Sequence, residues 1–563
     1  MKKKMIPVLV AILLILVVAA AGVGMKLIEK YSYSKERADL AEYFGVSNNE
    51  DVAILLQNEF LEQKAKLWNG TYYLDFDTVQ TYFNDRFYVD KVENLLIYTT
   101  PTDIISAPIE GSTVNTSGVP SEENYIISTY KEDMLYVAID YVKKYTNFSY
   151  EAFTEPNRMQ IYTEWGTRQL ADIAKNTTIR YQGGVKSEIL EDINAGEQVI
   201  VLERLENWSK VKSADGVIGY IENKRLTNER DEIQTPVTDV AEPDYTSISK
   251  DYKINLGWHQ VTNVTANSTL QETLAKTKGI NTISPTWFSL SDNEGNFTSI
   301  ASADYVMTAH NLGIEVWALI DNFNDAVDTK EVLSSATKRA YLIQGLMNQV
   351  MQYDIDGINV DFEQVQVEAG QNYIQFLREL SIACRANKIV LSVDNYVPKE
   401  HSAHYNRKEQ GIVADYVIIM GYDEHYGGGG EAGSVASIDF VEEGIKNTVA
   451  EVPSNKVINA IPFYTRVWTT TGTEVKGTSV GMGTAEALLS QHGVEAVWNE
   501  ETCQNYGEYQ DGDSLVQVWL EDAASIDVKL NIMAKYDLAG VAEWKLGLET
   551  ANIWDTIIAY TMK

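Results

Sequence analysis

Short runs of apolar residues recur along the C-terminal part of the chain, and stretches with helical spacing separate them. Most of the runs are rich in β-branched residues, which is typical of parallel strands that are covered on both faces. In the stretch 369–388, for example, Tyr373, Leu377 and Leu380 recur on one face of a helix. The apolar runs lie at 254–261, 280–290, 314–320, 356–362, 389–397, 415–423, 456–464 and 540–546.

These runs with their helical spacers predict a (β/α)8 barrel over residues 246–563. A doubly wound sheet is the alternative fold, but no glycine-rich phosphate loop follows the first predicted strand. The spacer between the last two strands is long, 465–539, and it includes the stretch NYGEYQDGDSLVQVWLED. We expect this stretch to form a hairpin over one rim of the barrel.

The N-terminus has a different pattern, in which three lysines precede an uncharged and mostly apolar run from Met5 to Met25. A helix of this length can cross about 30 Å of hydrocarbon. The lysines on the short side predict that the N-terminal end stays in the cytoplasm and that the rest of the chain lies outside. A cleaved signal peptide is the alternative, because Ala19 to Ala21 could form a small-residue cleavage site. The run is longer than the apolar part of a usual signal peptide, which favours a retained anchor.

Residues 31–175 are rich in tyrosine and contain two similar halves. The stretch 73–99 matches 136–163, so that Tyr73 aligns with Tyr136 and both halves end on the letters IYT. Each half reads as a helical stretch followed by a short strand, which predicts a tandem α+β stalk. The region loosely resembles the stalk domains of the copper amine oxidase N-terminal type, and this resemblance implies neither copper nor oxidase chemistry.

Residues 176–228 alternate between apolar and polar positions and are interrupted by turn signals such as Asp215-Gly216. This pattern predicts a small all-β barrel and is similar to bacterial SH3-like domains, which in exported proteins often bind peptidoglycan. The domain could equally be a spacer, since Trp208 and Tyr220 could simply belong to its core. An acidic, proline-bearing linker follows at 229–245.

Composition narrows the class of protein. The net charge is −34, which argues against nucleic-acid binding because that function needs a basic surface. The chain has two cysteines, Cys384 and Cys503, which do not make a disulfide framework, and their pairing stays open. The six histidines are scattered, and we interpret His401 and His404 as an ordinary loop pair.

Acidic and aromatic side chains gather at the ends of the predicted barrel strands, where the active sites of such barrels lie. The stretch DGINVDFE places Asn359, Asp361 and Glu363 on alternate positions, so that all three point into one mouth. Asp356 has the opposite parity and is expected to brace the strand. Aromatic faces mixed with carboxylates suit a sugar. The ends as a group supply Trp258, Trp287, Asp321, Asp361, Glu363, Asn395, Tyr422, Asp423, Tyr464, Arg466 and Trp544.

DGINVDFE resembles the signature of family 18 glycoside hydrolases, which runs Asp-x-x-Asp-x-Asp-x-Glu on the fourth barrel strand. The stretches MGYD at 420–423, IPFYTRVW at 461–468 and GVAEWKLGLE at 540–549 are similar to that family's sixth, seventh and eighth strands. The resemblance spans nearly all of 246–563 and is closest to bacterial cell-wall and spore-germination members. It implies no metal and no other cofactor.

The resemblance also implies roles for individual residues. Glu363 would be the proton donor, Asp361 would orient the substrate's 2-acetamido group, and Tyr422 would hydrogen-bond that group's carbonyl oxygen. Trp544 would form the floor of the subsite for the sugar that is cleaved. Further substrate-binding residues would be Asn359, Asp423, Tyr464 and Arg466.

Asn359 departs from the resembled pattern, which has an aspartate there. An asparagine is uncharged and has a permanent N–H donor. We hypothesise that Asn359 donates to Asp361 and holds it ionised, which would make Asp361 less sensitive to low pH than in an Asp–Asp pair.

The sequence therefore predicts a multidomain, single-pass membrane protein that places a glycoside hydrolase outside the cytoplasm. We expect the ranges 1–30 for the cytoplasmic tip and transmembrane helix, 31–175 for the stalk, 176–228 for the SH3-like domain, 229–245 for the linker and 246–563 for the barrel. The expected partners are the membrane, the cell wall through the SH3-like domain, and a polysaccharide, either peptidoglycan or chitin oligomers. The alternative function is a glycan-binding, lectin-like envelope protein without turnover.

Overall fold

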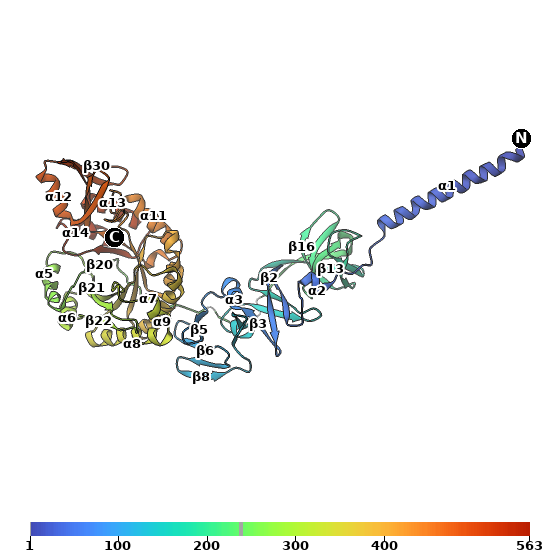
Figure 1. Ribbon diagram of the computed structural model, residues 1–563, viewed down its shortest axis with the longest axis horizontal. Helices are drawn as coiled ribbons and strands as arrows, with labels where there is room; N and C mark the ends of the chain where they lie inside the picture. Colours follow the sequence, from blue (N-terminus) through green and yellow to red (C-terminus); the bar gives the residue numbers. More distant parts are fainter. Residues whose placement is uncertain (1, 236–239, 242, 563) are drawn as a thin grey trace. The chain divides into compact units, whose positions relative to one another are not determined.

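The computed structural model describes residues 2–235, 240–241 and 243–562 (Figure 1). The chain divides into two compact units. The first runs to Phe87 and adds Ala107–Thr113 and a stretch that begins at Glu122; the second comprises Tyr88–Ser106, Val114–Ser121 and the stretch from Pro243 onward. The expected domain ranges stay predictions. Residues 1, 236–239, 242 and 563 of those ranges lie outside the described residues.

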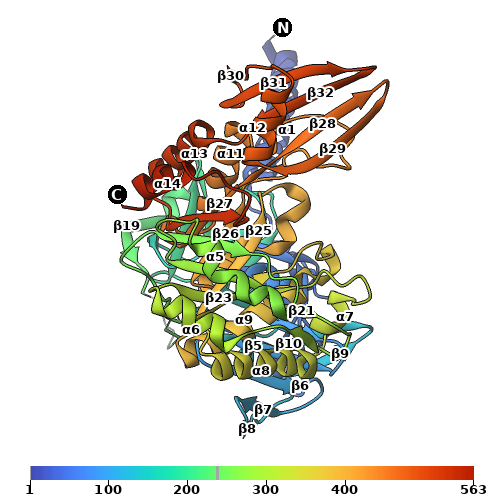
Figure 2. The same ribbon diagram turned by 90° about the vertical axis from the view of Figure 1, so that its left-hand side faces the viewer.

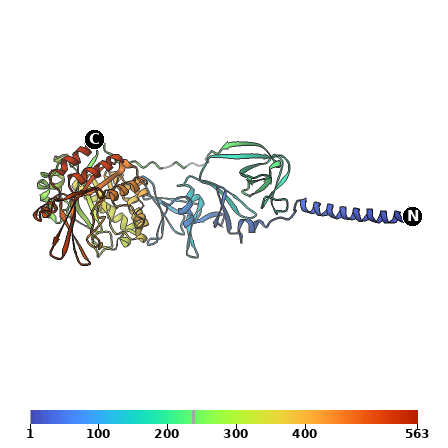
Figure 3. The same cartoon turned by 90° about the horizontal axis from the view of Figure 1, so that it is seen from above.

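The first unit begins with one long helix, α1 (Lys2–Tyr31), which Figure 3 shows as a single unbroken rod. Its segment Ile6–Tyr31 has 26 residues, with a mean hydropathy of 3.0 over an 18-residue stretch, and is long and apolar enough to cross a membrane. The same properties are found in a signal sequence near an N-terminus. The helix therefore fits both alternatives that the sequence left open.

The stalk region forms a seven-stranded sheet in the order β11-β12-β1-β2-β3-β10-β9. The two similar halves each start with a strand that the sequence analysis did not include, β3 and β10, and these pair antiparallel. The short helices α3 and α4 follow them. The bounds are α2 Leu40–Phe44, β1 Asp51–Leu56, β2 Glu59–Trp68, β3 Thr71–Asp75, α3 Phe76–Tyr82, β9 Ser128–Lys131, β10 Met134–Ala138, α4 Ile139–Lys143, β11 Ser149–Phe153 and β12 Arg158–Tyr162.

The predicted all-β SH3-like region is confirmed as a second seven-stranded sheet, in the order β15-β14-β18-β17-β16-β13-β19. The bounds are β13 Thr167–Ile173, β14 Thr177–Arg180, β15 Ile189–Ile193, β16 Gln198–Arg204, β17 Trp208–Lys212, β18 Ile218–Glu222, η1 Asn223–Arg225 and β19 Leu226–Ile233. Strand β19 pairs with β13 as far as Ile233. The expected linker at 229–245 therefore begins as a strand.

The second unit contains the predicted (β/α)8 barrel, which is confirmed. Its parallel strands close into a ring because β20 pairs with both β33 and β21. The strands are β20 Ile254–His259, β21 Thr282–Leu290, β23 Glu315–Asp321, β24 Gly357–Asp361, β25 Val390–Tyr396, β26 Tyr416–Met420, β27 Val457–Pro462 and β33 Gly540–Trp544; the short β22 Phe297–Ser299 adds antiparallel to β21.

Helices surround the strands of this barrel (Figure 2). Side chains such as Ile358 and Val360 on β24 pack outward in the main hydrophobic core, whereas Leu256, Leu319 and Ile418 form a separate cluster inside the ring. The helices are η2 Val264–Thr269, α5 Leu270–Leu274, α6 Ala303–Asn311, α7 Thr329–Leu333, α8 Ala336–Tyr353, η3 Val367–Ala369, α9 Gly370–Asn387, η4 Glu400–Tyr405, α10 Arg407–Val413, α11 Ile438–Val449, η5 Ser454–Lys456, α13 Ala523–Lys535 and α14 Ile553–Thr561.

The long spacer after β27 folds as a separate five-stranded sheet with one helix (Figure 2). The strand order is β29-β28-β32-β31-β30, and β31 pairs antiparallel with β32, which confirms the predicted hairpin. The bounds are β28 Tyr464–Thr471, β29 Glu474–Gly481, α12 Met482–Gln491, β30 Val497–Asn499, β31 Gln504–Asp511 and β32 Ser514–Leu520.

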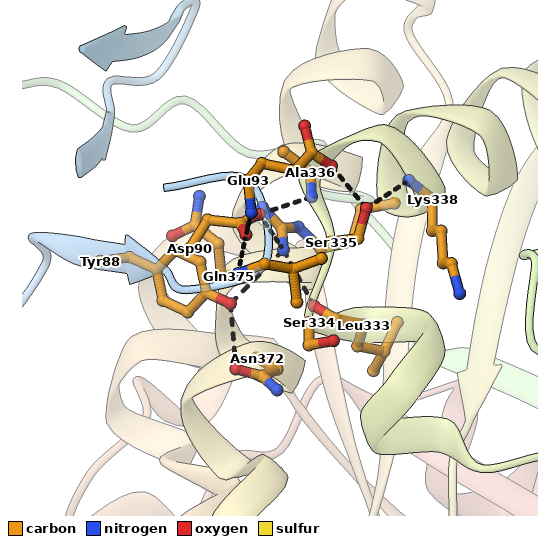
Figure 4. A network of polar contacts seen from close by, with 12 residues as sticks. Tyr88, Asp90, Glu93, Leu333, Ser334, Ser335, Ala336, Lys338, Asn372 and Gln375 are labelled. Carbon is orange, nitrogen blue, oxygen red and sulfur yellow. Dashed lines mark hydrogen bonds and ion pairs between the residues drawn. The ribbon is translucent and has the colours of Figure 1, made fainter. Parts of the chain in front are cut away.

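Most of a small sheet in the expected stalk belongs to the same unit as the barrel, with Tyr88–Ser106 and Val114–Ser121. Its strands are β4 Tyr88–Asp90, β5 Leu95–Thr99, β6 Ile104–Pro108, β7 Thr113–Thr116 and β8 Val119–Glu122. The Asp90 carboxylate accepts a hydrogen bond of 2.6 Å from the backbone N–H of Ala336, and the Glu93 carboxylate accepts one of 2.6 Å from that of Thr337 (Figure 4). Both acids thus lie at the N-terminus of α8, where a helix favours negative charge.

Candidate active site

The mouth of the barrel receives side chains from several strand ends, and strand β24 contributes the central group. Gly357, Asn359 and Asp361 have the parity that faces the interior, while Ile358 and Val360 pack outward into the main core. Gly357 has room for no side chain, because an added Cβ would lie 2.6 Å from the ring of Trp317. The strand therefore packs closely against Trp317 inside the ring, and this contact helps to fix the positions of Asn359 and Asp361.

Asn359 is completely buried, and its side-chain amide makes four hydrogen bonds. Its Oδ1 accepts from the Trp258 indole N–H at 2.9 Å and from the Ser284 hydroxyl at 3.1 Å. Its Nδ2 donates to the Ser392 hydroxyl at 3.1 Å and to Asp394 Oδ1 at 2.9 Å. Every donor and acceptor of this amide is therefore used.

The expectation that Asn359 donates to Asp361 is wrong, since both N–H groups of Asn359 point to the neighbouring strand. Among the described residues, Asp361 Oδ1 is buried and has no hydrogen-bond partner. Burial raises the pKa of Asp361 well above its ordinary value, and the nearby carboxylates of Asp394, Glu363 and Asp321 raise it further. Burial and the neighbouring acids thus oppose the ionised form of Asp361, which the hypothesis about Asn359 expected to be favoured.

Asp394 is the acid that the sequence analysis missed. It is 2% exposed and lies on β25, whose register pairs Asn359 with Ser392 and Val360 with Val393. The next position of that register sets Asp394 beside Asp361. Burial raises the pKa of Asp394 to about 8; the bond from Asn359 lowers it and the charge of Glu363 raises it.

Glu363 follows the end of β24 and is half-buried. Its Oε2 accepts a hydrogen bond of 2.8 Å from the Tyr396 hydroxyl, and its backbone is held by Asn322, which both donates to its carbonyl and accepts from its N–H at 2.8 Å. Burial raises the pKa of Glu363, the bond from Tyr396 lowers it, and the charges of Asp423 and Asp321 raise it again. The net upward direction favours the protonated form, as a proton donor needs.

Tyr422 and Trp544 lie at two other strand ends of the same mouth. Burial is the main cause that raises the pKa of Tyr422 well above its ordinary value, and the charges of Asp361 and Glu363 also contribute. Its hydroxyl therefore keeps its proton and can donate a hydrogen bond, and it interacts electrostatically with Asp361 and Glu363. The Trp544 ring is partly exposed and meets Trp258 edge-on, with ring centroids 5.8 Å apart.

Asp423, Tyr464 and Arg466 form a bonded cluster at the rim. The Tyr464 hydroxyl donates to Asp423 Oδ1 at 2.6 Å, and the Arg466 guanidinium pairs with the same oxygen at 2.7 Å. These three residues line a cavity of about 230 Å³ together with Trp544. The three predicted substrate-binding residues are thus brought together beside the predicted sugar platform.

A second, larger cavity of about 560 Å³ has Glu363 in its lining. Its walls come from the loop after β23 and from the residues after Glu363, and amide side chains such as Asn322 and Gln364 are frequent in them. The ring of Phe323 is exposed at this cavity. Glu363 therefore lies where an extended chain that fills this cavity would pass.

Two residues that the sequence analysis placed in the mouth lie elsewhere. Trp287 is buried outside the ring, where its indole N–H donates to Asn267 Oδ1 at 2.8 Å. Asn395 points away from the ring and exchanges hydrogen bonds with Gln410 on α10. The alternation of side chains along a strand explains both positions, because Trp287 and Asn395 each lie on the side of the strand that faces the helices.

The bracing role expected for Asp356 agrees with its contacts. Its Oδ2 accepts from the backbone N–H of Val316 at 2.8 Å and lies 2.8 Å from His310 Nε2. Cys384 is buried and Cys503 is partly exposed, and neither forms a disulfide. In the part of the chain that the structure describes, no group of three or more His, Cys, Asp and Glu side chains has the arrangement of a metal site.

Comparison with known proteins identifies the family of the barrel region. The family model described as Glycosyl hydrolases family 18 matches residues 217–549, and that of the Bacterial SH3 domain matches 175–227. The chain is 28% identical over 297 residues to a Bacillus subtilis protein named Uncharacterized glycosylase YvbX, which covers 49% of this chain and 84% of that one. It is 26% identical over 233 residues to the Cortical fragment-lytic enzyme of Bacillus subtilis, which covers 40% of this chain and 54% of that enzyme. The chain thus spans about half the length of the second relative.

Among solved structures, a chitinase from Chromobacterium violaceum ATCC 12472 is similar, with a TM-score of 0.50 and 22% identity over 55% of this chain and 99% of that one. At this identity the likeness concerns the fold alone. It agrees with the closed barrel described above.

Proposed function

The chain belongs to family 18 of the glycosyl hydrolases, and on this premise we propose that it cleaves β-1,4 bonds after N-acetylglucosamine in peptidoglycan, outside the cytoplasm. The observation that carries the proposal is the pairing of the half-buried Glu363 with the fully buried Asp361 in a mouth that also contains Tyr422 and Trp544. The name of the relative described as a cortical fragment-lytic enzyme supports a cell-wall glycan as the substrate.

In the proposed first step, Glu363 gives its proton to the glycosidic oxygen while the bond from that oxygen to the anomeric carbon breaks. The carbonyl oxygen of the substrate's own 2-acetamido group bonds to the anomeric carbon from the opposite face, which yields a positively charged oxazolinium ring. Asp361 accepts a hydrogen bond from the acetamido N–H and offsets the new charge. Tyr422 donates to the acetamido oxygen and aligns it for the attack.

In the second step, the ionised Glu363 takes a proton from a water molecule, whose oxygen attacks the anomeric carbon and opens the ring. Two displacements on opposite faces return the sugar to its original configuration. The raised pKa of Glu363 supports its acid role in the first step. The bond from the Tyr396 hydroxyl at 2.8 Å supports its ionised form in the second.

The experiment uses the full chain in mild detergent with three substrates: peptidoglycan, N-acetylglucosamine oligomers and a glycan that lacks the 2-acetamido group. We expect new reducing ends from peptidoglycan or from the oligomers, none from the third substrate, and none from E363Q. Release from chitin-type oligomers alone would replace peptidoglycan by a chitin-like substrate. Binding of the glycan without release by the wild type would favour the lectin-like alternative, and release by E363Q would overturn the mechanism.

We further propose that α1 anchors the chain and that the SH3-like domain binds the cell wall. The length and hydropathy of α1 support the first point, and the match to the bacterial SH3 domain supports the second. Sedimentation with purified sacculi tests the second point, with the full chain compared with a variant that lacks residues 175–227. Since the barrel also binds glycan, both proteins carry E363Q and are measured in excess oligosaccharide. Equal sedimentation would assign the domain the role of a spacer.

A further inference from the structure

The site keeps a second buried acid, although this chain has Asn359 at the position where the resembled pattern has an aspartate. On β24 the interior positions are Asn359 and Asp361, and on β25 they are Ser392 and Asp394. The paired register of these strands places Asn359 opposite Ser392 and Val360 opposite Val393, so Asp361 and Asp394 follow at the next position of two strands that lie about 4.8 Å apart. An acid is thus missing from one strand and present on the next.

The hydrogen bonds of Asn359 connect the amide on β24 with the acid on β25. Its Nδ2 donates to Asp394 Oδ1 at 2.9 Å, so the amide and the acid are direct partners. An aspartate at 359 with an asparagine at 394 could keep the same contact with the donor and acceptor reversed. The contacts from Trp258 and Ser284 would also persist, because both donate to Oδ1 of residue 359.

Within the described residues, no positive charge pairs with the two acids. The titratable groups that act on Asp361 or Asp394 are Asp321 from β23, Glu363 after β24, and the phenol groups of Tyr373 on α9, Tyr405 on η4 and Tyr422 after β26. Tyr396 on β25 is bonded to Glu363. Among the described residues, no lysine, arginine or histidine forms an ion pair with Asp361 or Asp394. Two carboxyls this close in a buried site keep one proton between them.

We propose that Asp394 is a positioning residue that shares one proton with Asp361 and takes over the place of the acid that the resembled pattern has at 359. Before the substrate binds, the proton lies on the buried carboxyl of Asp361 and is shared with the buried carboxyl of Asp394. When the oxazolinium charge develops, the proton moves to Asp394, and Asp361 is left negative and oriented by the O–H of its neighbour. No proton leaves the pair. This inference rests on the proposed function.

The pKa values of both acids are shifted upward, as a shared proton requires. The pKa of Asp394 is raised to about 8, first by burial, and that of Asp361 is raised well above its ordinary value. The bond from Asn359 lowers the pKa of Asp394 and so favours return of the proton to Asp361 when the site is at rest. With both sites buried, the proton belongs to the pair rather than to one residue.

The first test compares kcat against pH for the wild type and D394N. In D394N an amide N–H replaces the shared proton as a permanent donor to Asp361, so we expect a kcat within about 10-fold of the wild type near neutral pH. Above pH 8 the wild type loses the shared proton and D394N cannot, so the ratio of mutant to wild-type kcat should rise. Parallel alkaline limbs would overturn the proposal. D394V, which offers no donor, should lose about 10- to 100-fold in kcat with little change in KM.

The second test exchanges the two side chains. N359D alone adds a third buried carboxyl and should lose more than about 10-fold in kcat. The double variant N359D/D394N restores one acid and one amide and should recover to within about 10-fold of the wild type. A double variant that is no more active than N359D would sink the idea. This variant also carries the test if D394N alone does not fold.

The third test does not depend on activity. A carboxyl whose folded pKa is raised loses stability as pH rises from its unfolded value to its folded value. The unfolding temperature of D394N should therefore rise relative to the wild type as pH increases toward 8, and the difference should level off above it. A difference that does not change with pH would contradict a proton at Asp394. If the wild type releases no reducing ends, the proposed function fails, while this measurement still decides whether the proton is there.

Discussion

At the scale of single side chains, Tyr396 adjusts how readily Glu363 gives up its proton. Its hydroxyl donates to Glu363 Oε2 at 2.8 Å, which favours the ionised form and lowers the pKa, while burial raises that pKa by more. Y396F removes the lowering, so the pKa of Glu363 should rise and the alkaline limb of kcat/KM should move up by about one pH unit. The control Y305F changes a buried tyrosine outside the ring and should leave the limb in place. An unmoved limb in Y396F would show that this bond does not tune the acid.

Trp544 should act through its ring face. It lies beside the cavity that Asp423, Tyr464 and Arg466 line, and its ring is partly exposed there. W544A removes the platform for the sugar at the cleavage point, so kcat/KM should fall about 10-fold or more. Measurement with N-acetylglucosamine oligomers checks this, with W498A on β30 as the control. Equal losses in both variants would mean that the effect is not specific to the platform.

The parity of β24 could be predicted from the sequence, but the partners of its side chains could not. Alternation in DGINVDFE places Asn359 and Asp361 inside the ring, as the structure has them. The choice of Asp394 over Asp361 as the partner of Asn359 depends on strand pairing, which a local pattern does not contain. The signal for Asp394 was nevertheless present. Ser392, Asp394 and Tyr396 recur at alternate positions of this strand, and that pattern indicates an interior polar row.

At the scale of elements, the small sheet β4–β8 helps to hold helix α8. Glu93 accepts from the Thr337 N–H at 2.6 Å and from the Thr337 hydroxyl at 3.0 Å, at the end of the helix where N–H groups lack partners. E93A should therefore lower the free energy of unfolding by about 1–2 kcal/mol. Denaturant unfolding measures this. E495A, on an exposed stretch of the same unit, is the control, and equal stability of the two variants would contradict the capping role.

The same sheet shows where the sequence pattern stops being informative. The two IYT segments end similar halves, yet β12 pairs with β1 in the first unit, while β5 belongs to the second unit with the barrel. Arg339 on α8 is completely buried, pairs with Glu379 at 2.9 Å and lies 3.6 Å from Asp90. The contact between Arg339 and Asp90, which are far apart in sequence, depends on how α8 packs against the small sheet. A barrel cut at residue 246 would leave this arginine without one of its acids.

At the scale of the whole molecule, we expect α1 to determine where the barrel works. The segment Ile6–Tyr31 has 26 residues, enough to span about 30 Å of hydrocarbon at 1.5 Å per residue. We expect the full chain to stay in the membrane fraction through a high-salt wash, which removes proteins held by charge alone. A variant that lacks residues 2–31 and carries a cleavable export signal should appear in the soluble fraction with unchanged kcat on oligosaccharides. The mass of the purified full chain completes the test: an N-terminus just after Ala19 to Ala21 would show that the helix is a cleaved signal and would contradict the retained anchor.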